Sequence, residues 1–211
     1  MTPPIHFAVR EGHTEMARFL LERGADPEKA GASRATPKLN KFFSTTAENM
    51  LETIRESLYH QFGASVDMLE NAIRMCPDEY WEAHQFWYQA FHCLFFLDYY
   101  LSENPREFAP PLPFDESEFE DRLPDRVYSR EELLAYLACS RRRCEALLAG
   151  LTPGRLTARW VNSSGSMDYS VHEILLYNLR HVQHHTAQLN LLLRQTIDEA
   201  PEWVFRGGER S

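Results

Sequence analysis

The sequence lacks the features that mark membrane, secreted and nucleic-acid-binding proteins. It contains no run of about 18 apolar residues, so we expect no membrane-spanning helix. Residues 1–18 carry charged side chains and no apolar signal-peptide core, which favours a cytoplasmic location. The 31 acidic side chains outnumber the 22 Lys and Arg side chains and give a formal net charge of −9. That charge argues against a nucleic acid or an anionic membrane as the partner.

Cysteine is also scarce. The four cysteines form no C-x-x-C pair and match no zinc-binding spacing; they are Cys76, Cys93, Cys139 and Cys144. In the absence of an export signal we predict reduced thiols rather than disulfides. Cys93 directly follows His92, but successive residues on a helix are turned by about 100°. We therefore predict that Cys93 is a packed thiol and not a nucleophile.

The first 29 residues form a segment of their own. The strings P-P-I-H-F-A at residues 3–8, G-H-T-E at 12–15 and G-A-D-P at 24–27 resemble one ankyrin repeat. Pro3 departs from the pattern, which usually has threonine there. A single repeat cannot bury its own apolar face, so we expect a short ankyrin-like helical hairpin that is a remnant. His6 and His13 would be turn residues, and residues 30–42 a linker rich in small residues.

Four long segments repeat apolar residues at steps of three and four, which is the pattern of amphipathic helices. The first covers residues 46–77, the third 129–150 and the fourth 170–197. The second ends at residue 102 and begins at residue 78 or at residue 83. Ser129 with Glu132 and Ser170 with Glu173 have the capping-box spacing that begins a helix. Pro77 ends the first segment, and aromatic residues on all sides of the second predict a deeply buried helix. The pattern predicts an all-α four-helix bundle over residues 43–198, followed by a tail over 199–211.

A long connection joins the second and third predicted helices. Residues 104–128 contain five prolines and an acidic stretch made up of Asp115, Glu116, Glu118, Glu120, Asp121 and Asp125. We predict a solvated loop without a metal role for these carboxylates, although its length also suits a lid or an interface. The basic run at residues 141–143 is expected to be a solvated face or the partner of this acidic loop.

The fourth predicted helix holds three of the nine histidines, and these three fall within a stretch of five residues. His181 and His185 lie one turn apart within its apolar stripe, which comprises Val171, Ile174, Leu175, Val182, Leu189, Leu192 and Leu193. His184 lies on the flank. His172, nine residues before His181, points to the opposite face. Two histidines one turn apart can bind the same metal ion. The alternative is that they bind no metal and are either exposed on the helix surface or packed in the core with hydrogen-bond partners.

His92 lies in the middle of the aromatic second helix. If the bundle forms, His92, His181 and His185 supply three neutral nitrogen donors from facing helices. Three protein ligands leave a position for water or substrate, as catalytic metal sites do. Gln188, three residues after His185, is a candidate to orient that ring or a bound water, or else a helix-packing residue.

These residues carry a family resemblance. Residues 68–101, with C-P-D-E-Y-W at 76–81 and His92, resemble the DinB/YfiT-like superfamily. The string H-V-Q-H-H-T-A-Q-L at 181–189 is similar to N-H-x-x-H-H-R-G-Q-L, which many members carry, but has threonine and alanine where arginine and glycine are common. The resemblance implies a four-helix bundle, often dimeric, that holds a divalent metal on His92, His181 and His185. The ion would be zinc, nickel or iron.

The resemblance also implies a function. Members include metal-dependent transferases and isomerases that use bacillithiol, mycothiol or glutathione. We therefore expect a metal-dependent enzyme in which the ion activates a thiol or water, either a small-thiol S-transferase or a hydrolase. Its partners would be a small-molecule electrophile and a low-molecular-weight thiol, and the chain would form a homodimer. The alternative is a non-catalytic, stress-related metal-binding bundle that uses its ankyrin-like start for protein contacts.

Overall fold

The computed structural model describes the backbone of residues 36–208 and the side chains of residues 48–208. The predicted ankyrin-like hairpin, with His6 and His13, therefore lies outside the described residues. The chain divides into two compact units, residues 1–53 and 54–211. The site described below lies entirely within the second unit.

Helix α3 (Thr36–Met75) is longer than the sequence predicts. It begins ten residues before the expected start at Thr46. Pro37 lies in its first turn, where a missing backbone N–H breaks no helical hydrogen bond, so proline does not prevent this early start. The helix ends before Pro77, as predicted. Its inward stripe is buried from Leu58 onward and comprises Leu58, Phe62, Val66, Leu69 and Ile73.

The second predicted helix is interrupted near its start. Helix α4 (Asp78–Trp81) and the 3₁₀ turn η1 (Ala83–Gln85) precede the longer helix α5 (Phe86–Leu101). His84 and Gln85 have left-handed backbone angles, with φ of 54° and 57°, so one helix cannot run through them. Helix α5 is buried on several sides, as its aromatic composition predicts: Phe91, Cys93, Leu94, Phe95 and Leu97 have no exposed surface.

Capping residues begin the two helices that follow. Ser129 and Glu132 form both hydrogen bonds of a capping box at the start of helix α6 (Arg130–Ala149). Helix α7 (Pro153–Thr157) leads to the two strands β1 (Arg159–Val161) and β2 (Asp168–Ser170), which pair antiparallel with Trp160 opposite Tyr169. In helix α8 (Val171–Ile197), the Ser170 side chain accepts from the backbone N–H of Glu173.

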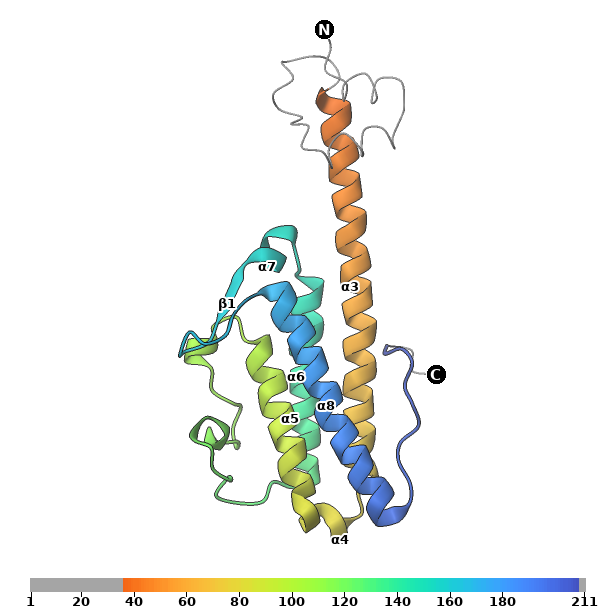
Figure 1. Ribbon diagram of the computed structural model, residues 1–211, viewed down its shortest axis with the longest axis vertical. Coiled ribbons are helices and arrows are strands. Elements are labelled where there is room, and N and C mark those ends of the chain that lie inside the picture. The colour runs from red at the N-terminus through yellow and green to blue at the C-terminus, as the bar shows by residue number, and fades with distance from the viewer. Residues whose placement is uncertain (1–35, 209–211) are drawn as a thin grey trace. The chain divides into compact units, whose positions relative to one another are not determined.

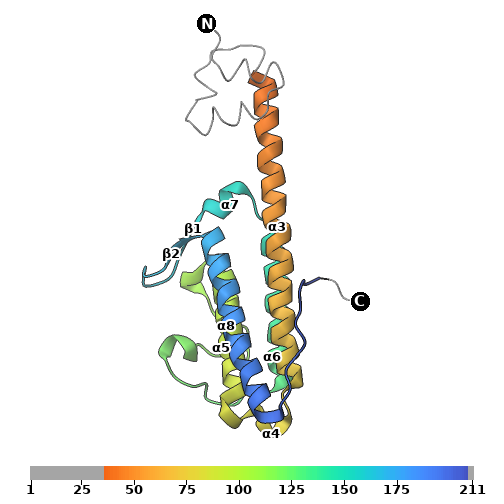
Figure 2. The ribbon, with the colours of Figure 1, turned by 45° about the vertical axis from the view of Figure 1, so that its right-hand side comes forward.

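The long helices pack around a shared core in the second unit (Figures 1 and 2). Helix α5 contacts both α6 and α8. Ser65 of α3 accepts a hydrogen bond from Gln183 of α8 at 2.6 Å. The described chain is thus mostly helical, which confirms the all-α prediction apart from the short β pair. None of the described helices is both long enough and apolar enough to cross a membrane.

The basic run pairs with helices and not with the acidic loop. Arg141 of α6 lies 2.7 Å from Asp67 and 2.9 Å from Glu70, both on α3. Arg143 lies 2.5 Å from the buried carboxylate of Asp98 on α5. These ion pairs link α6 to its neighbours because α6 packs between α3 and α5, so the prediction of an acidic-loop partner is wrong for these two arginines.

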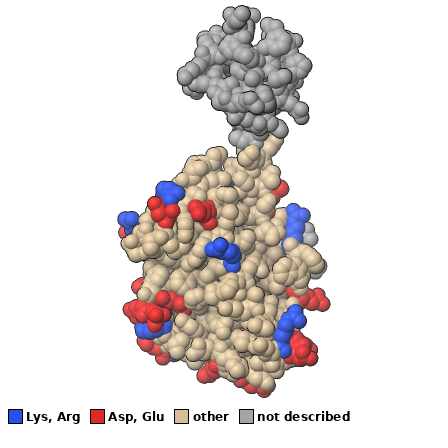
Figure 3. Space-filling model, viewed as in Figure 1, with Lys and Arg blue, Asp and Glu red and all other residues tan. Residues whose placement is uncertain are grey.

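The connection between α5 and α6 is only partly solvated. It contains two 3₁₀ turns, η2 (Pro105–Glu107) and η3 (Ser117–Glu120), and it buries Phe114 and Ser117. Figure 3 shows acidic side chains gathered at the left edge, where Figure 1 draws this connection. Its aromatic residues contact the helices: Phe114 is buried, and the Phe119 ring, although 45% exposed, lies 4.9 Å from that of Phe95 on α5. The connection therefore forms one wall of the helical core.

Candidate metal centre

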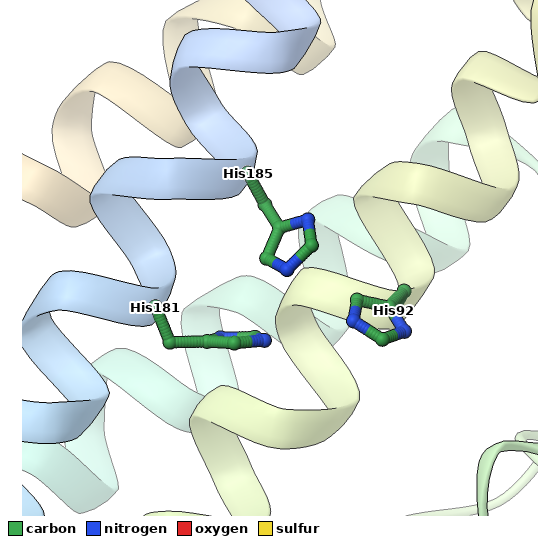
Figure 4. Close-up of side chains that lie close together, drawn as sticks. All are labelled: His92, His181 and His185. Carbon is green, nitrogen blue, oxygen red and sulfur yellow. The ribbon is translucent and has the colours of Figure 1, made fainter.

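The structure brings three of the predicted site residues together. His92 comes from α5, and His181 and His185 come from α8, the helix that contacts α5 most extensively. One ring nitrogen from each histidine lies within 4.8 Å of those of the other two. The ring centroids are 4.4 Å apart for His181 and His185, and 4.5 Å apart for His92 and His185. Figure 4 shows the three rings converging in the space between the two helices.

Helical geometry explains which histidines converge. Leu175, Val182 and Leu189 on α8 are fully buried, and His181 and His185 lie along this buried stripe. His184 is exposed, although its ring lies 5.0 Å from that of His185. His184 and His172 are both outside the group of three converging histidines among the residues that the structure describes. Both outcomes agree with the sequence prediction.

Burial keeps the two α8 histidines neutral. Burial first, and then the neighbouring His185 and His92, lower the pKa of His181 to about 3. The pKa of His185 is lowered to about 4, chiefly by burial and then by His92 and His184. The nearby Gln188 side chain opposes this lowering of the His185 pKa. At neutral pH both rings therefore offer a lone pair, which is the form that binds a metal ion.

The donor set fits a first-row divalent ion. The Nδ1 atom of His181 is buried and has no hydrogen-bond partner in the described part of the chain. Leaving a buried polar nitrogen unpaired is unfavourable, so the two helices hold the His181 ring here at some cost in stability. The ring nitrogens that converge could share one cation, because imidazole suits zinc, nickel, copper and iron.

The acidic connection contributes a residue that the sequence analysis missed. Oε2 of Glu118 lies 2.7 Å from Nδ1 of His92, and the Glu118 side chain is only 4% exposed. The prediction that every carboxylate of this connection is solvated is therefore wrong for Glu118. No spacing rule links residues 26 positions apart. The available signal was Phe108, Phe114 and Phe119, three aromatic residues in an acidic segment, which indicate packing against the core.

Aromatic rings line the histidine cluster. The Phe96 ring lies 4.9 Å from that of His92 and 5.7 Å from that of His181. The Tyr100 ring lies 5.7 Å from that of His181 on another side. These rings cover part of the cluster and lower the local dielectric constant, which strengthens electrostatic interactions there. Cys93 is fully buried and burial raises its pKa well above the usual range, so it is the inert thiol that we predicted.

Comparison with known families agrees with this geometry. Residues 3–31 match the ankyrin repeat family and contain a single repeat. Comparisons with curated proteins and with solved structures give no match. Residues 61–189, which include all three converging histidines and Glu118, match the family model described as DinB superfamily. Because that match covers more than half of the sequence, the chain belongs to the DinB superfamily.

Proposed function

We propose that the second unit is a DinB-type four-helix bundle that binds one divalent metal ion on His92, His181 and His185. The observation that carries this proposal is the convergence of three ring nitrogens within 4.8 Å, although His92 lies 89 positions before His181 in the sequence. The rings of His181 and His185 stay neutral at pH 7 because they are partly buried, so they need not lose a proton before binding. The ion is zinc, nickel or iron.

We further propose an enzyme that joins a low-molecular-weight thiol to a small electrophile. A metal ion held by three histidines retains a coordination position and lowers the pKa of a thiol or water bound there. His181 and His185 hold their rings in place through the rigid helix α8. Phe96 and Tyr100 keep bulk water away from the cluster and offer an apolar surface to the electrophile. Glu118 accepts a hydrogen bond from His92 and so fixes that ring.

A second candidate function is a protein-binding, non-catalytic bundle with the same metal ion. The match of residues 3–31 to an ankyrin repeat favours it, because ankyrin repeats form binding surfaces in stacked arrays. The two candidates differ in what the metal does. In an enzyme, removing a histidine abolishes activity and leaves the fold largely intact, whereas a structural metal is needed mainly for stability.

The metal is tested first. The full chain is purified without added metal, and its metal content is measured for the wild type, His92→Ala, His185→Ala and His184→Ala. We expect about one ion per wild-type chain, loss of the ion in the first two variants and retention in the last. His184 is a matched control because it is an exposed neighbour of His185 on the same helix. An ion retained in a variant lacking both His92 and His185 would refute the site.

The reaction is tested next with the metal-loaded chain. Bacillithiol, mycothiol and glutathione are each supplied with a chromogenic aryl electrophile, and thioether formation is followed. We expect turnover by the wild type and by His184→Ala, and none by His185→Ala. Turnover by none of these proteins with any thiol, together with a metal-dependent rise in the thermal midpoint, would favour the non-catalytic candidate.

A further inference from the structure

We propose that Glu118 is a positioning residue of the metal centre, acting through His92. Its carboxylate accepts the Nδ1–H of His92, so that Nε2 is the atom directed at the metal. The proposal rests on the proposed metal site and assigns a role to the connection between α5 and α6. Glu118 is not placed among the ligands themselves, because it is not one of the residues whose donor atoms converge.

The environment of Glu118 differs from that of the other carboxylates in this connection. Asp115, Glu120 and Asp125 all lie within 4 Å of Arg122 and are partly or largely exposed. The Glu118 side chain is almost fully buried, and its Oε2 hydrogen-bonds to Nδ1 of His92 at 2.7 Å. Its second oxygen, Oε1, is buried and has no hydrogen-bond partner there. A carboxylate is costly to bury, so a positive charge nearby would stabilise Glu118 in this position.

A bound dication would supply that charge. Three neutral imidazoles contribute none, so the ion would keep its full double charge in an aromatic, low-dielectric environment. Glu118 brings one negative charge to the far side of the His92 ring. Histidine ligands commonly donate their second ring N–H to a carboxylate, which fixes the tautomer and orientation of the ring and makes it a better ligand. The pair of Glu118 and His92 has this arrangement.

The backbone around Glu118 is held against α5 and is therefore able to position it. The N–H of Ser117 donates to Oδ1 of Asp115 at 3.1 Å, and the N–H of Asp115 donates to the Tyr128 hydroxyl at 3.1 Å. On the other side of Glu118, the Phe119 ring packs 5.0 Å from that of Tyr99. Contacts on both sides thus hold the η3 turn, and a supported turn can keep the Glu118 oxygen within the narrow range that ligand positioning needs.

The proposal is tested by zinc affinity. The wild type, Glu118→Ala, Glu118→Gln and Glu116→Gln are titrated in competition with a chromophoric zinc chelator. We expect Glu118→Ala to bind zinc about 10–100-fold more weakly and Glu118→Gln to lose less, because an amide oxygen still accepts from Nδ1–H. Glu116→Gln is the matched control, since Glu116 is exposed two residues earlier and should bind like the wild type. Circular dichroism of the metal-free variants checks that each is folded.

A second measurement keeps the test decisive if Glu118→Ala does not fold. Nitrogen-15 NMR of the zinc-loaded wild type should show His92 with a protonated Nδ1 and a zinc-bound Nε2. Zinc on Nδ1 of His92 would overturn the proposal, as would wild-type affinity in a folded Glu118→Ala variant. Either result leaves the three-histidine site standing. Failure of the wild type itself to bind any of the three metals refutes the proposed function instead.

Discussion

Gly207 is the position where the C-terminal tail is most sensitive to substitution. Here the tail crosses α3, and Gly207 N–H donates to the His60 carbonyl at 3.0 Å. In return, Nδ1 of His60 donates to the Gly207 carbonyl at 2.9 Å. A Cβ atom on Gly207 would lie 2.2 Å from the Gly63 carbonyl carbon and 2.3 Å from the Ala64 nitrogen. Both are backbone atoms of a helix, so they cannot rotate aside, and Gly207→Ala should lift the tail off α3.

The cost follows from the contacts that are lost. Two hydrogen bonds contribute about 1 kcal/mol each, so releasing the tail should destabilise the second unit by about 2 kcal/mol. For a unit of the size of residues 54–211, each kcal/mol lowers the thermal midpoint by about 2–4 °C. We therefore expect the midpoint of Gly207→Ala to fall by about 4–8 °C. Trypsin should also cleave after Arg206 faster, because the released tail is accessible more of the time.

The assay is differential scanning calorimetry of the metal-free chain, with Gly154→Ala as the matched control. A Cβ on Gly154 has as its nearest neighbour the Thr152 hydroxyl at 4.0 Å, so this substitution introduces no clash. It should leave the midpoint unchanged or raise it slightly, because alanine favours a helix. A midpoint of Gly207→Ala within about 1 °C of this control would refute the reasoning, since it would mean that the tail contributes no stability where it crosses α3.

Two further predictions concern protonation and capping. The depressed pKa values of His181 and His185 mean that the unfolded chain binds more protons below pH 6.5, so the metal-free protein should lose stability as the pH falls from 6.5 towards 4. Urea unfolding at several pH values should show this loss, and the free energy of unfolding of His181→Gln should depend less steeply on pH. An equal pH dependence in the wild type and the variant would contradict the attribution of the effect to His181. Ser129→Ala removes the side-chain cap of α6 and should cost about 1 kcal/mol in the same assay, whereas an unchanged midpoint of unfolding would show that Glu132 alone suffices.

Helix positions could be predicted where a local rule applied. The capping pair Ser129 and Glu132 begins α6 at the expected residue, and Pro77 limits α3 at its C-terminal end. The break at His84 and Gln85 could not be predicted, because left-handed backbone angles normally attract glycine or asparagine. The early start of α3 was missed because its first residues look like a linker. Small residues and a proline suggested a linker, but a proline in the first turn is compatible with a helix.

In the candidate site too, the residues that follow a local helix rule could be predicted, and the residue that depends on tertiary packing could not. His181 and His185 could be paired from their spacing because the α-helix places every fourth residue on one face. His92 required one more step, the expectation that an aromatic helix faces α8, and the contacts between α5 and α8 agree with it. Glu118 lies on a non-helical turn, where sequence distance gives no direction for a side chain. Its place beside His92 is determined by tertiary packing of the connection, which a pattern of single residues does not encode.

Packing of the connection also explains why an acidic segment can lie beside the histidine cluster although only one of its carboxylates, that of Glu118, contacts a histidine of the cluster. The exposed carboxylates around Glu118 are held at the surface by Arg122, through contacts of 2.5 Å to Glu120 and 3.1 Å to Asp125. Phe119 is adjacent to Glu118 and anchors the turn on α5 through Phe95 and Tyr99. One carboxylate is thereby buried while its neighbours remain in water. A connection with Arg122 and Phe119 both replaced by alanine should therefore weaken zinc binding even with Glu118 present, and chelator competition that gave wild-type affinity would show that Glu118 is positioned by its own hydrogen bond alone.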